Sequence, residues 1–182
     1  MGRRKYWGIG LGLSGLYLLY CLFDKVKIDR DIGNMLEKQQ ISYTRYFTTP
    51  APVQNWLWFI VAGNDKGYYV GFYSLFDRKK EINLEYFPRN DSLLKTVRDQ
   101  MELQRLILFS KQFYTVEKWG DSLVFNDLRF GQIKGWQDPR GKFVFHFFLN
   151  QKAGNKMVVQ RGRFEGWNRE TAASFLKRVI GN

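Results

Sequence analysis

The hydrophobic pattern of the chain begins with one long uncharged segment. Residues 6–23 (YWGIGLGLSGLYLLYCLF) carry no charged side chain, and Arg3, Arg4 and Lys5 precede them. A membrane-spanning helix needs about 20 mostly apolar residues, and about 17 suffice when flanking side chains reach the interface. Tyrosine and tryptophan near the two ends of the run suit the interfacial zones of a bilayer. The pattern therefore predicts a transmembrane helix over residues 1–23.

A cleaved signal peptide is the alternative interpretation of this segment. The apolar part of a signal peptide is usually about 7–15 residues long and ends in small residues. Here the run ends in LYCLF, and the bulky Tyr20 makes the likeness of Cys21 to a lipoprotein processing site faint. We therefore expect a retained helix. Its basic N-terminal flank predicts, by the positive-inside rule, that the rest of the chain lies outside the bacterial cytoplasmic (inner) membrane.

Three glycines within the apolar run fall at helical spacing: Gly8, Gly12 and Gly15. Gly8 and Gly12 form a small-xxx-small pair, which lets a second membrane helix approach closely. Glycine is also common in membrane helices that have no such contact. The spacing leaves both interpretations open, and the partners it allows are other transmembrane helices.

The apolar positions keep a helical period after the charged residues begin. Those that fall roughly on one helical face are Val26, Ile32, Met35, Leu36 and Gln39. Gly33 is the one strong helix breaker in this stretch. We expect a juxtamembrane helix over residues 24–41 that continues the membrane helix.

Strand patterns dominate from residue 42 onward. The expected strands cover residues 42–48, 56–62, 68–76, 81–87, 113–119, 123–130, 143–149 and 157–164, and turn-forming residues separate them. Two segments have a helical period, residues 90–110 and residues 168–181, and the second opens with Asn168 as its N-cap. Successive strands without alternating helices predict an α+β fold, with a mostly antiparallel sheet and two helices forming a soluble domain over residues 42–182.

The net charge of the chain limits the classes of binding partner that we expect. The formal net charge is +12, which suits an acidic membrane surface, an anionic ligand or a nucleic acid. The basic residues are scattered, and no block of five or six like charges occurs. This spread favours a surface that faces lipid or water, so we expect membrane lipid as a partner and no nucleic acid.

Candidate chemistry is sparse. Asp127 and Arg129 lie two residues apart on a predicted strand and therefore on one face, where they form either a structural ion pair or an anion pocket. His146 is the only histidine and shares a strand face with Val144 and Phe148. It is either a core histidine with one hydrogen bond or a catalytic base. No metal site is expected, because neither a two-histidine spacing nor a calcium-type loop occurs.

Three stretches resemble the C-terminal region of a known family. They are residues 43–52 (YTRYFTTPAP) with NWLW at 55–58, residues 67–75 (GYYVGFYSL), and residues 125–131 (FNDLRFG). The likeness is to bacterial membrane-bound metal-dependent hydrolases, the LexA-regulated inner-membrane type, and it covers nearly the whole chain. The family's metal ligands are His and Asp residues of its N-terminal membrane part, in Pro-Asp-x-Asp and Thr-His-Ser motifs that do not occur here.

The resemblance implies an accessory or ligand-binding module without a cofactor of its own, with a divalent metal bound elsewhere. The chain would then be a truncated or split member, and Gly8, Gly12 and Gly15 would pack against other membrane helices. One alternative is an independent single-pass envelope protein whose β domain binds a lipid or an anionic ligand. Another is an enzyme that uses Asp127, Arg129 and His146.

Overall fold

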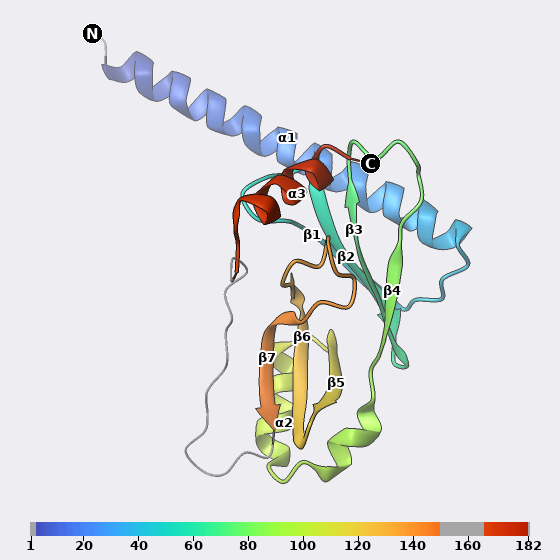
Figure 1. Cartoon of the computed structure of the whole chain (residues 1–182). Helices are drawn as coiled ribbons and strands as arrows, with labels where there is room; N and C mark the ends of the chain where they lie inside the picture. The colour runs from blue at the N-terminus through green and yellow to red at the C-terminus, as the bar shows by residue number, and fades with distance from the viewer. Residues whose placement is uncertain (1–2, 150–165, 182) are drawn as a thin grey trace.

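The computed structural model describes residues 3–149 and 166–181, and it shows an α+β fold with a long apolar N-terminal helix and two antiparallel sheets (Figure 1). The predicted strand at 157–164 lies outside the described residues. In chain order the elements are α1 (Arg3–Lys38), β1 (Arg45–Pro50), β2 (Leu57–Asn64), β3 (Gly67–Ser74), β4 (Leu84–Pro88), the 3-10 helix η1 (Asp91–Thr96), α2 (Gln100–Phe109), β5 (Tyr114–Trp119), β6 (Ser122–Gln132), β7 (Phe143–Leu149) and α3 (Arg169–Val179).

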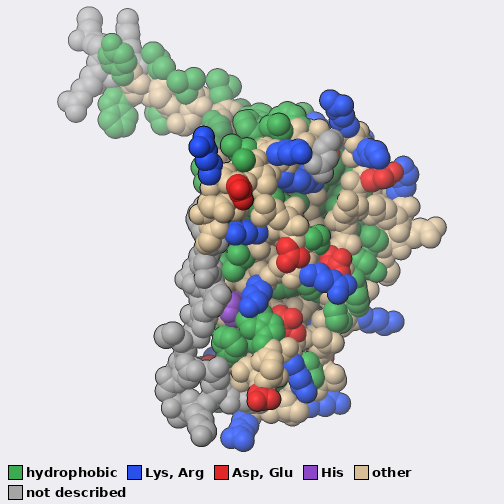
Figure 2. Space-filling view, viewed as in Figure 1, with side chains coloured by type: hydrophobic (Ala, Val, Ile, Leu, Met, Phe, Trp, Pro, Cys, Tyr) green, Lys and Arg blue, Asp and Glu red, His purple; other side chains and the backbone are tan. Residues whose placement is uncertain are grey.

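Helix α1 is continuous, and its two halves have different surroundings. Its 36 residues give a length of about 54 Å at 1.5 Å per residue. The first half projects away from the rest of the protein (Figures 1 and 2), and no residue of its most apolar stretch is buried. By length and composition this part of α1 can cross a membrane. The second half lies along the four-stranded sheet.

The second half of α1 forms a core with one face of that sheet. Ile28, Ile32, Met35 and Leu36 are buried against side chains of β2 and β3 that include Trp58, Ile60, Ala62 and Tyr73. The expectation that Val26 lies on this face is wrong, because Val26 is 60% exposed. It sits two residues, about 200° around the helix, from Ile28, which begins the buried stripe.

The four-stranded sheet has the order β1-β2-β3-β4, with every neighbouring pair antiparallel. Its second face packs against the smaller sheet, where Phe59, Val61 and Val70 meet Leu128 and Phe143. Both faces of β2 are therefore covered, and Leu57–Gly63 is buried throughout. This explains why the sequence of β2 is continuously apolar and does not alternate.

The smaller sheet has the order β5-β6-β7 and carries α2 on one face. The single helix expected over residues 90–110 is wrong: η1 and α2 are separate. Val97 is extended, with φ −75° and ψ 128°, and the Asp99 side chain accepts a hydrogen bond from the Glu102 N–H at 2.8 Å. Asp99 therefore caps α2 as a new helix, and this capping is favoured over a continuation of η1.

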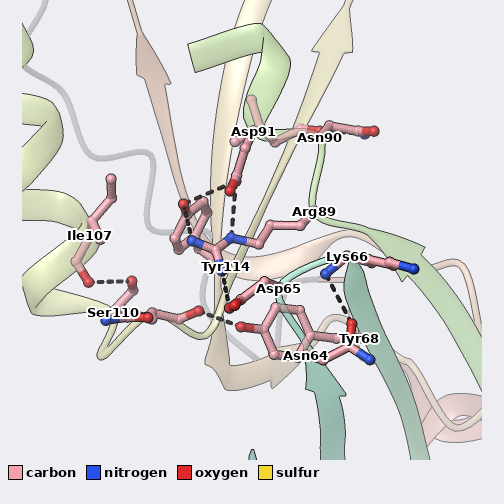
Figure 3. Close-up of polar contacts among 12 residues, drawn as sticks. Asn64, Asp65, Lys66, Tyr68, Arg89, Asn90, Asp91, Ile107, Ser110 and Tyr114 are labelled. Carbon is pink, nitrogen blue, oxygen red and sulfur yellow. Dashed lines mark hydrogen bonds and ion pairs between the residues drawn. The ribbon is translucent and has the colours of Figure 1, made fainter. Parts of the chain in front are cut away.

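A buried arginine ties the two sheets together (Figure 3). The Arg89 guanidinium donates to Asp65 in the β2–β3 turn at 2.9 Å, to Asp91 at 2.9 Å and to the Tyr114 hydroxyl on β5 at 2.7 Å. Its Cζ lies 4.5 Å from the centre of the Tyr114 ring. Beside it, the Tyr68 hydroxyl donates to the Gln112 carbonyl at 2.5 Å. These contacts join the β2–β3 hairpin of the larger sheet to β5 and the loop before it.

Tyr114 makes this junction sensitive to high pH. Burial raises the pKa of Tyr114 from 10.0 to about 12, although the hydrogen bond from Arg89 opposes the rise. The unfolded chain therefore loses this proton first, and stability that is complete below pH 10 falls as the pH rises toward 12. Two pKa units correspond to a loss of about 2–3 kcal/mol.

We expect Tyr114→Phe to remove this component of the alkaline destabilisation. Thermal unfolding of the full chain in detergent, followed by circular dichroism between pH 9 and pH 12, measures it. Tyr86→Phe, at a tyrosine that is 42% exposed, is the matched control and keeps the wild-type slope. An equal pH slope for wild type and Tyr114→Phe would contradict the assignment.

Candidate functional site

Asp127 and Arg129 form the ion pair that their spacing allows. Arg129 Nε donates to Asp127 Oδ1 at 3.0 Å and Nη2 donates to Oδ2 at 2.7 Å, so the pair is bidentate. The Asp127 side chain is fully buried, and that of Arg129 is 20% exposed. The guanidinium also lies over the rings of Phe109 and Phe130, at 5.0 and 5.3 Å. This pair closes the side of the small sheet that carries α2.

His146 lies on the opposite face of the same sheet. It pairs in register with Asn126, whereas Asp127 pairs with Phe145, and successive side chains of a strand point to opposite faces. The imidazole is buried, its Nδ1 lies 3.2 Å from the Phe143 carbonyl, and its ring centre is 4.9 Å from that of Trp119. The structure therefore does not bring His146 together with the Asp127–Arg129 pair.

Asn126 stands beside His146 in a buried polar row. Its Nδ2 donates to Glu117 Oε1 at 2.7 Å, and Thr115 is its register partner on β5. Among the described residues, Asn126 Oδ1 has no hydrogen-bond partner. An unsatisfied buried acceptor costs about 1–3 kcal/mol, so this row lowers the stability of the sheet.

Gly8, Gly12 and Gly15 lie in the projecting half of α1. Within the described part of the chain, a Cβ built on any of them would meet no atom within 4 Å outside the helix backbone. Their surface is open in this single chain. Packing of these glycines against other helices stays a prediction.

An aromatic slot opens where the two sheets meet the segment just before α3. It is narrow, with a volume of about 30 Å³, and its walls include Pro50, Phe59, Phe72, Phe130, Trp136 and Trp167. Trp136 and Trp167 are 5.6 Å apart between ring centres and pack edge to face, and the Trp136 indole donates to Ser174 on α3 at 3.1 Å. The slot is therefore apolar, and the hydrogen bond fixes one of its walls.

A larger polar cleft adjoins the slot and shares Phe72, Gln132 and Trp136 with it. Its volume is about 710 Å³, and it runs between the loop after β3, the loop after β6 and α3. Arg178 in its wall is already neutralised by Asp77, through bonds of 2.7 and 2.9 Å.

Three other cations line or flank this cleft: Arg78, Lys79 and Lys177. All three are exposed, and none makes an ion pair with another described residue. With Asp77 and Glu81 also in the lining, the four cations leave the cleft with a net positive charge next to an apolar slot. The arrangement fits a ligand with an anionic head and an apolar tail.

The sequence interpretation missed this pair of cavities. Its walls come from β3, β6 and α3, which lie far apart along the chain. The one available signal was the position of Trp136 and Trp167, which fall in polar loops outside every predicted strand. Trp58, which lies within a predicted strand, is by contrast part of the core beneath α1.

Within residues 3–149 and 166–181, no three His, Cys, Asp or Glu side chains converge in a way that could hold a metal ion.

The buried ion pair generates a stability prediction. Arg129→Ala leaves the Asp127 carboxylate buried and unpaired, so we expect the free energy of unfolding to fall by about 3 kcal/mol. Asp127→Asn in the same chain removes the stranded charge, so the double variant should recover part of the loss. Denaturant unfolding of the full chain in micelles measures both.

Arg140→Ala is the matched control. Arg140 also pairs with a carboxylate, Glu85, but its side chain is 79% exposed, so its loss should change stability by no more than about 1 kcal/mol. Equal effects of Arg129→Ala and Arg140→Ala would show that the Asp127 pair is no more than a surface contact.

Comparison with known proteins suggests no function for this chain, so the functional proposal is based on the two cavities. No protein-family model, no curated protein and no solved structure matches this chain.

Proposed function

We propose that this chain is a single-pass membrane-anchored binding module whose slot and cleft take an anionic amphiphile. The membrane is the bacterial inner membrane, and the globular part lies on its outer side, as the basic flank of α1 favours. The observation that carries the proposal is the shared wall of an apolar slot and a cleft with a net positive charge.

The anchor is supported by the continuity of α1. The projecting half has the length and composition of a span, and the other half belongs to the core of the domain. The end of the apolar run is also tied to the domain, because Trp56 Nε1 donates to the Tyr20 hydroxyl at 2.7 Å and Asn55 donates to Asp24 at 2.8 Å. Such contacts favour a retained helix over a signal peptide that is removed.

The class of ligand follows from the two cavities taken together. The narrow aromatic slot can take a small apolar group of the ligand, such as the end of an acyl chain, which gains about 25 cal/mol for each Å² of surface that it buries. An anionic headgroup gains from Arg78 and Lys177, which form no ion pair with a described carboxylate, although Glu81 lines the same cleft. A soluble anion would use only the cleft, and an uncharged lipid would use only the slot.

The position of the cleft favours a ligand drawn from the membrane. Its loop begins at Asp77, directly after Phe76, whose ring centre lies 5.8 Å from that of Trp56. Trp56 in turn contacts Tyr20 near the end of the apolar run. One side of the cleft therefore lies close to the level at which α1 would leave the bilayer.

The resemblance to membrane-bound metal-dependent hydrolases is compatible with this proposal. A tail domain that binds an amphiphile would serve such a protein as an accessory module. The same binding activity would suit an independent single-pass protein. The proposal for this chain is the same in both cases, and it assigns no catalytic step.

Calorimetric titration of the full chain in phosphatidylcholine nanodiscs tests the ligand class, with empty nanodiscs subtracted. We expect dihexanoyl phosphatidate to bind more tightly than dihexanoyl phosphatidylcholine, which lacks net charge, and glycerol 3-phosphate, which lacks acyl chains. Arg78→Gln combined with Lys177→Gln should weaken phosphatidate binding by about tenfold, equivalent to about 1.4 kcal/mol.

Lys118→Gln is the matched control, because Lys118 is an exposed cation on β5 outside the cleft. It should leave the affinity unchanged. Equal binding of all three compounds, or an equal loss in the control and the cleft variant, would contradict the proposal.

A further inference from the structure

We propose that a membrane-proximal rim of this domain, Val53, Trp56, Phe76, Leu176 and Ile180, inserts into the interfacial zone of the bilayer that α1 crosses. The inference rests on the proposal that α1 spans the membrane. It adds a second attachment, which fixes how the domain is tilted over the lipid surface. The rim comes from three segments: the β1–β2 loop, the residues after β3 and the end of α3.

The rim residues are large apolar side chains that the fold leaves exposed. Val53 is 97% exposed and Ile180 is 69% exposed, and the other three are also solvent-accessible. On α3 the buried face consists of Thr171, Phe175 and Val179, so Leu176 and Ile180 form a separate outward strip. A single exposed leucine is ordinary, but a set that gathers at one end of a domain marks an interaction surface.

Contacts place these residues at the point where α1 leaves the domain. Trp56 donates to Tyr20 in α1, and its ring packs against Phe76. Gly181, next to Ile180, lies so close to the Phe76 carbonyl that a Cβ there would collide with it. The slot residue Ala51 and Leu57 flank the Val53 loop and pack against α3. The five residues thus belong to one end of the protein, and Figure 2 shows hydrophobic side chains gathered where α1 joins the domain.

Val53 combines exposure with an unfavourable backbone conformation. Its φ is +64°, a region that β-branched residues rarely adopt, and Asn or Gly would be accommodated there more easily. A strained residue points to a functional hypothesis when its surroundings do not need its side chain. Here the strain places an apolar side chain at the tip of the loop, where lipid can receive it.

The chemistry of the rim fits lipid as its occupant. Tryptophan and phenylalanine suit the headgroup boundary, and an apolar face of this kind enters it by about 5–10 Å. Arg78 lies two residues after Phe76 and Lys177 directly follows Leu176, and both cations add attraction to anionic headgroups. The surface is continuous with the apolar half of α1, so the same bilayer that holds the helix meets the rim.

Nitroxide labels on the full chain test the inference in nanodiscs of phosphatidylethanolamine and phosphatidylglycerol. In a Cys21→Ser background, single cysteines are placed by Val53→Cys, Ile180→Cys, Leu13→Cys and Leu108→Cys. Leu13 reports the span, and Leu108 is a matched apolar residue, 74% exposed, on α2 at the end of the domain far from α1 (Figure 1). Power saturation compares access by oxygen, which enters lipid, with access by a polar nickel chelate.

We expect labels at 13, 53 and 180 to be more accessible to oxygen than to nickel, and the label at 108 to show the reverse. Val53→Asn, which suits a positive φ and should not harm the fold, should lower the oxygen accessibility at 180. If 53 and 180 behave like 108 while 13 stays lipid-exposed, the rim inference fails and the anchor stands.

If the label at 13 is accessible to nickel, the anchor proposal fails, and the rim proposal fails with it. If 53 and 180 are shielded from both reagents and show spin–spin broadening, a second copy of the chain covers the rim. That outcome overturns lipid as its occupant.

Discussion

The packing of the second half of α1 onto the four-stranded sheet is the interaction on which the rest of the structure depends. Ile28, Ile32, Met35 and Leu36 fill the space above β2 and β3, and each such side chain contributes about 1.5–3 kcal/mol when fully buried. Polar contacts surround this apolar patch. Lys25 bonds to Asp29 at 2.7 Å and to Thr48 at 2.6 Å, and Lys80 bonds to Asp31 at 3.1 Å. The hydrogen bond between Lys80 and the Tyr73 hydroxyl raises the pKa of Lys80, so this cation keeps its charge at physiological pH.

This packing turns a helix that can cross a membrane into a rigid support for the domain. A flexible linker would let the cleft and the apolar rim take any orientation toward lipid. Because the second half of the continuous helix α1 is part of the core, α1 instead holds the β1–β2 loop, the residues after β3 and the end of α3 at one level. The hydrogen bonds of Arg89 to Asp65 and Tyr114 then connect the smaller sheet, which supplies Gln132 to the cleft and carries Trp136 in the loop after β6.

Much of this fold could be predicted from periodicity, and the functional surfaces could not. The apolar run, the antiparallel strands and the boundaries of β7 follow from local pattern alone. The break between η1 and α2 could not be predicted from local pattern. The helical period of the apolar residues continues on both sides of Asp99, whereas the Asp99 side chain caps a new helix there. Asp127 and His146 lie on opposite faces of the sheet because of the register between β6 and β7. A local sequence pattern does not contain that register. The cleft requires side chains from three distant elements, and the strain at Val53 depends on the loop that holds it.

Hydrogen exchange of the full chain in nanodiscs, followed at single amides by mass spectrometry, tests the central claim most directly. If residues 28–36 of α1 are a core element, their amides should exchange as slowly as those of β2, through global unfolding alone. Amides of α2, at the far end of the domain, serve as an internal reference for a helix whose outer face is exposed. Exchange of residues 28–36 much faster than that of β2 would show that the helix detaches from the sheet, and would contradict the account.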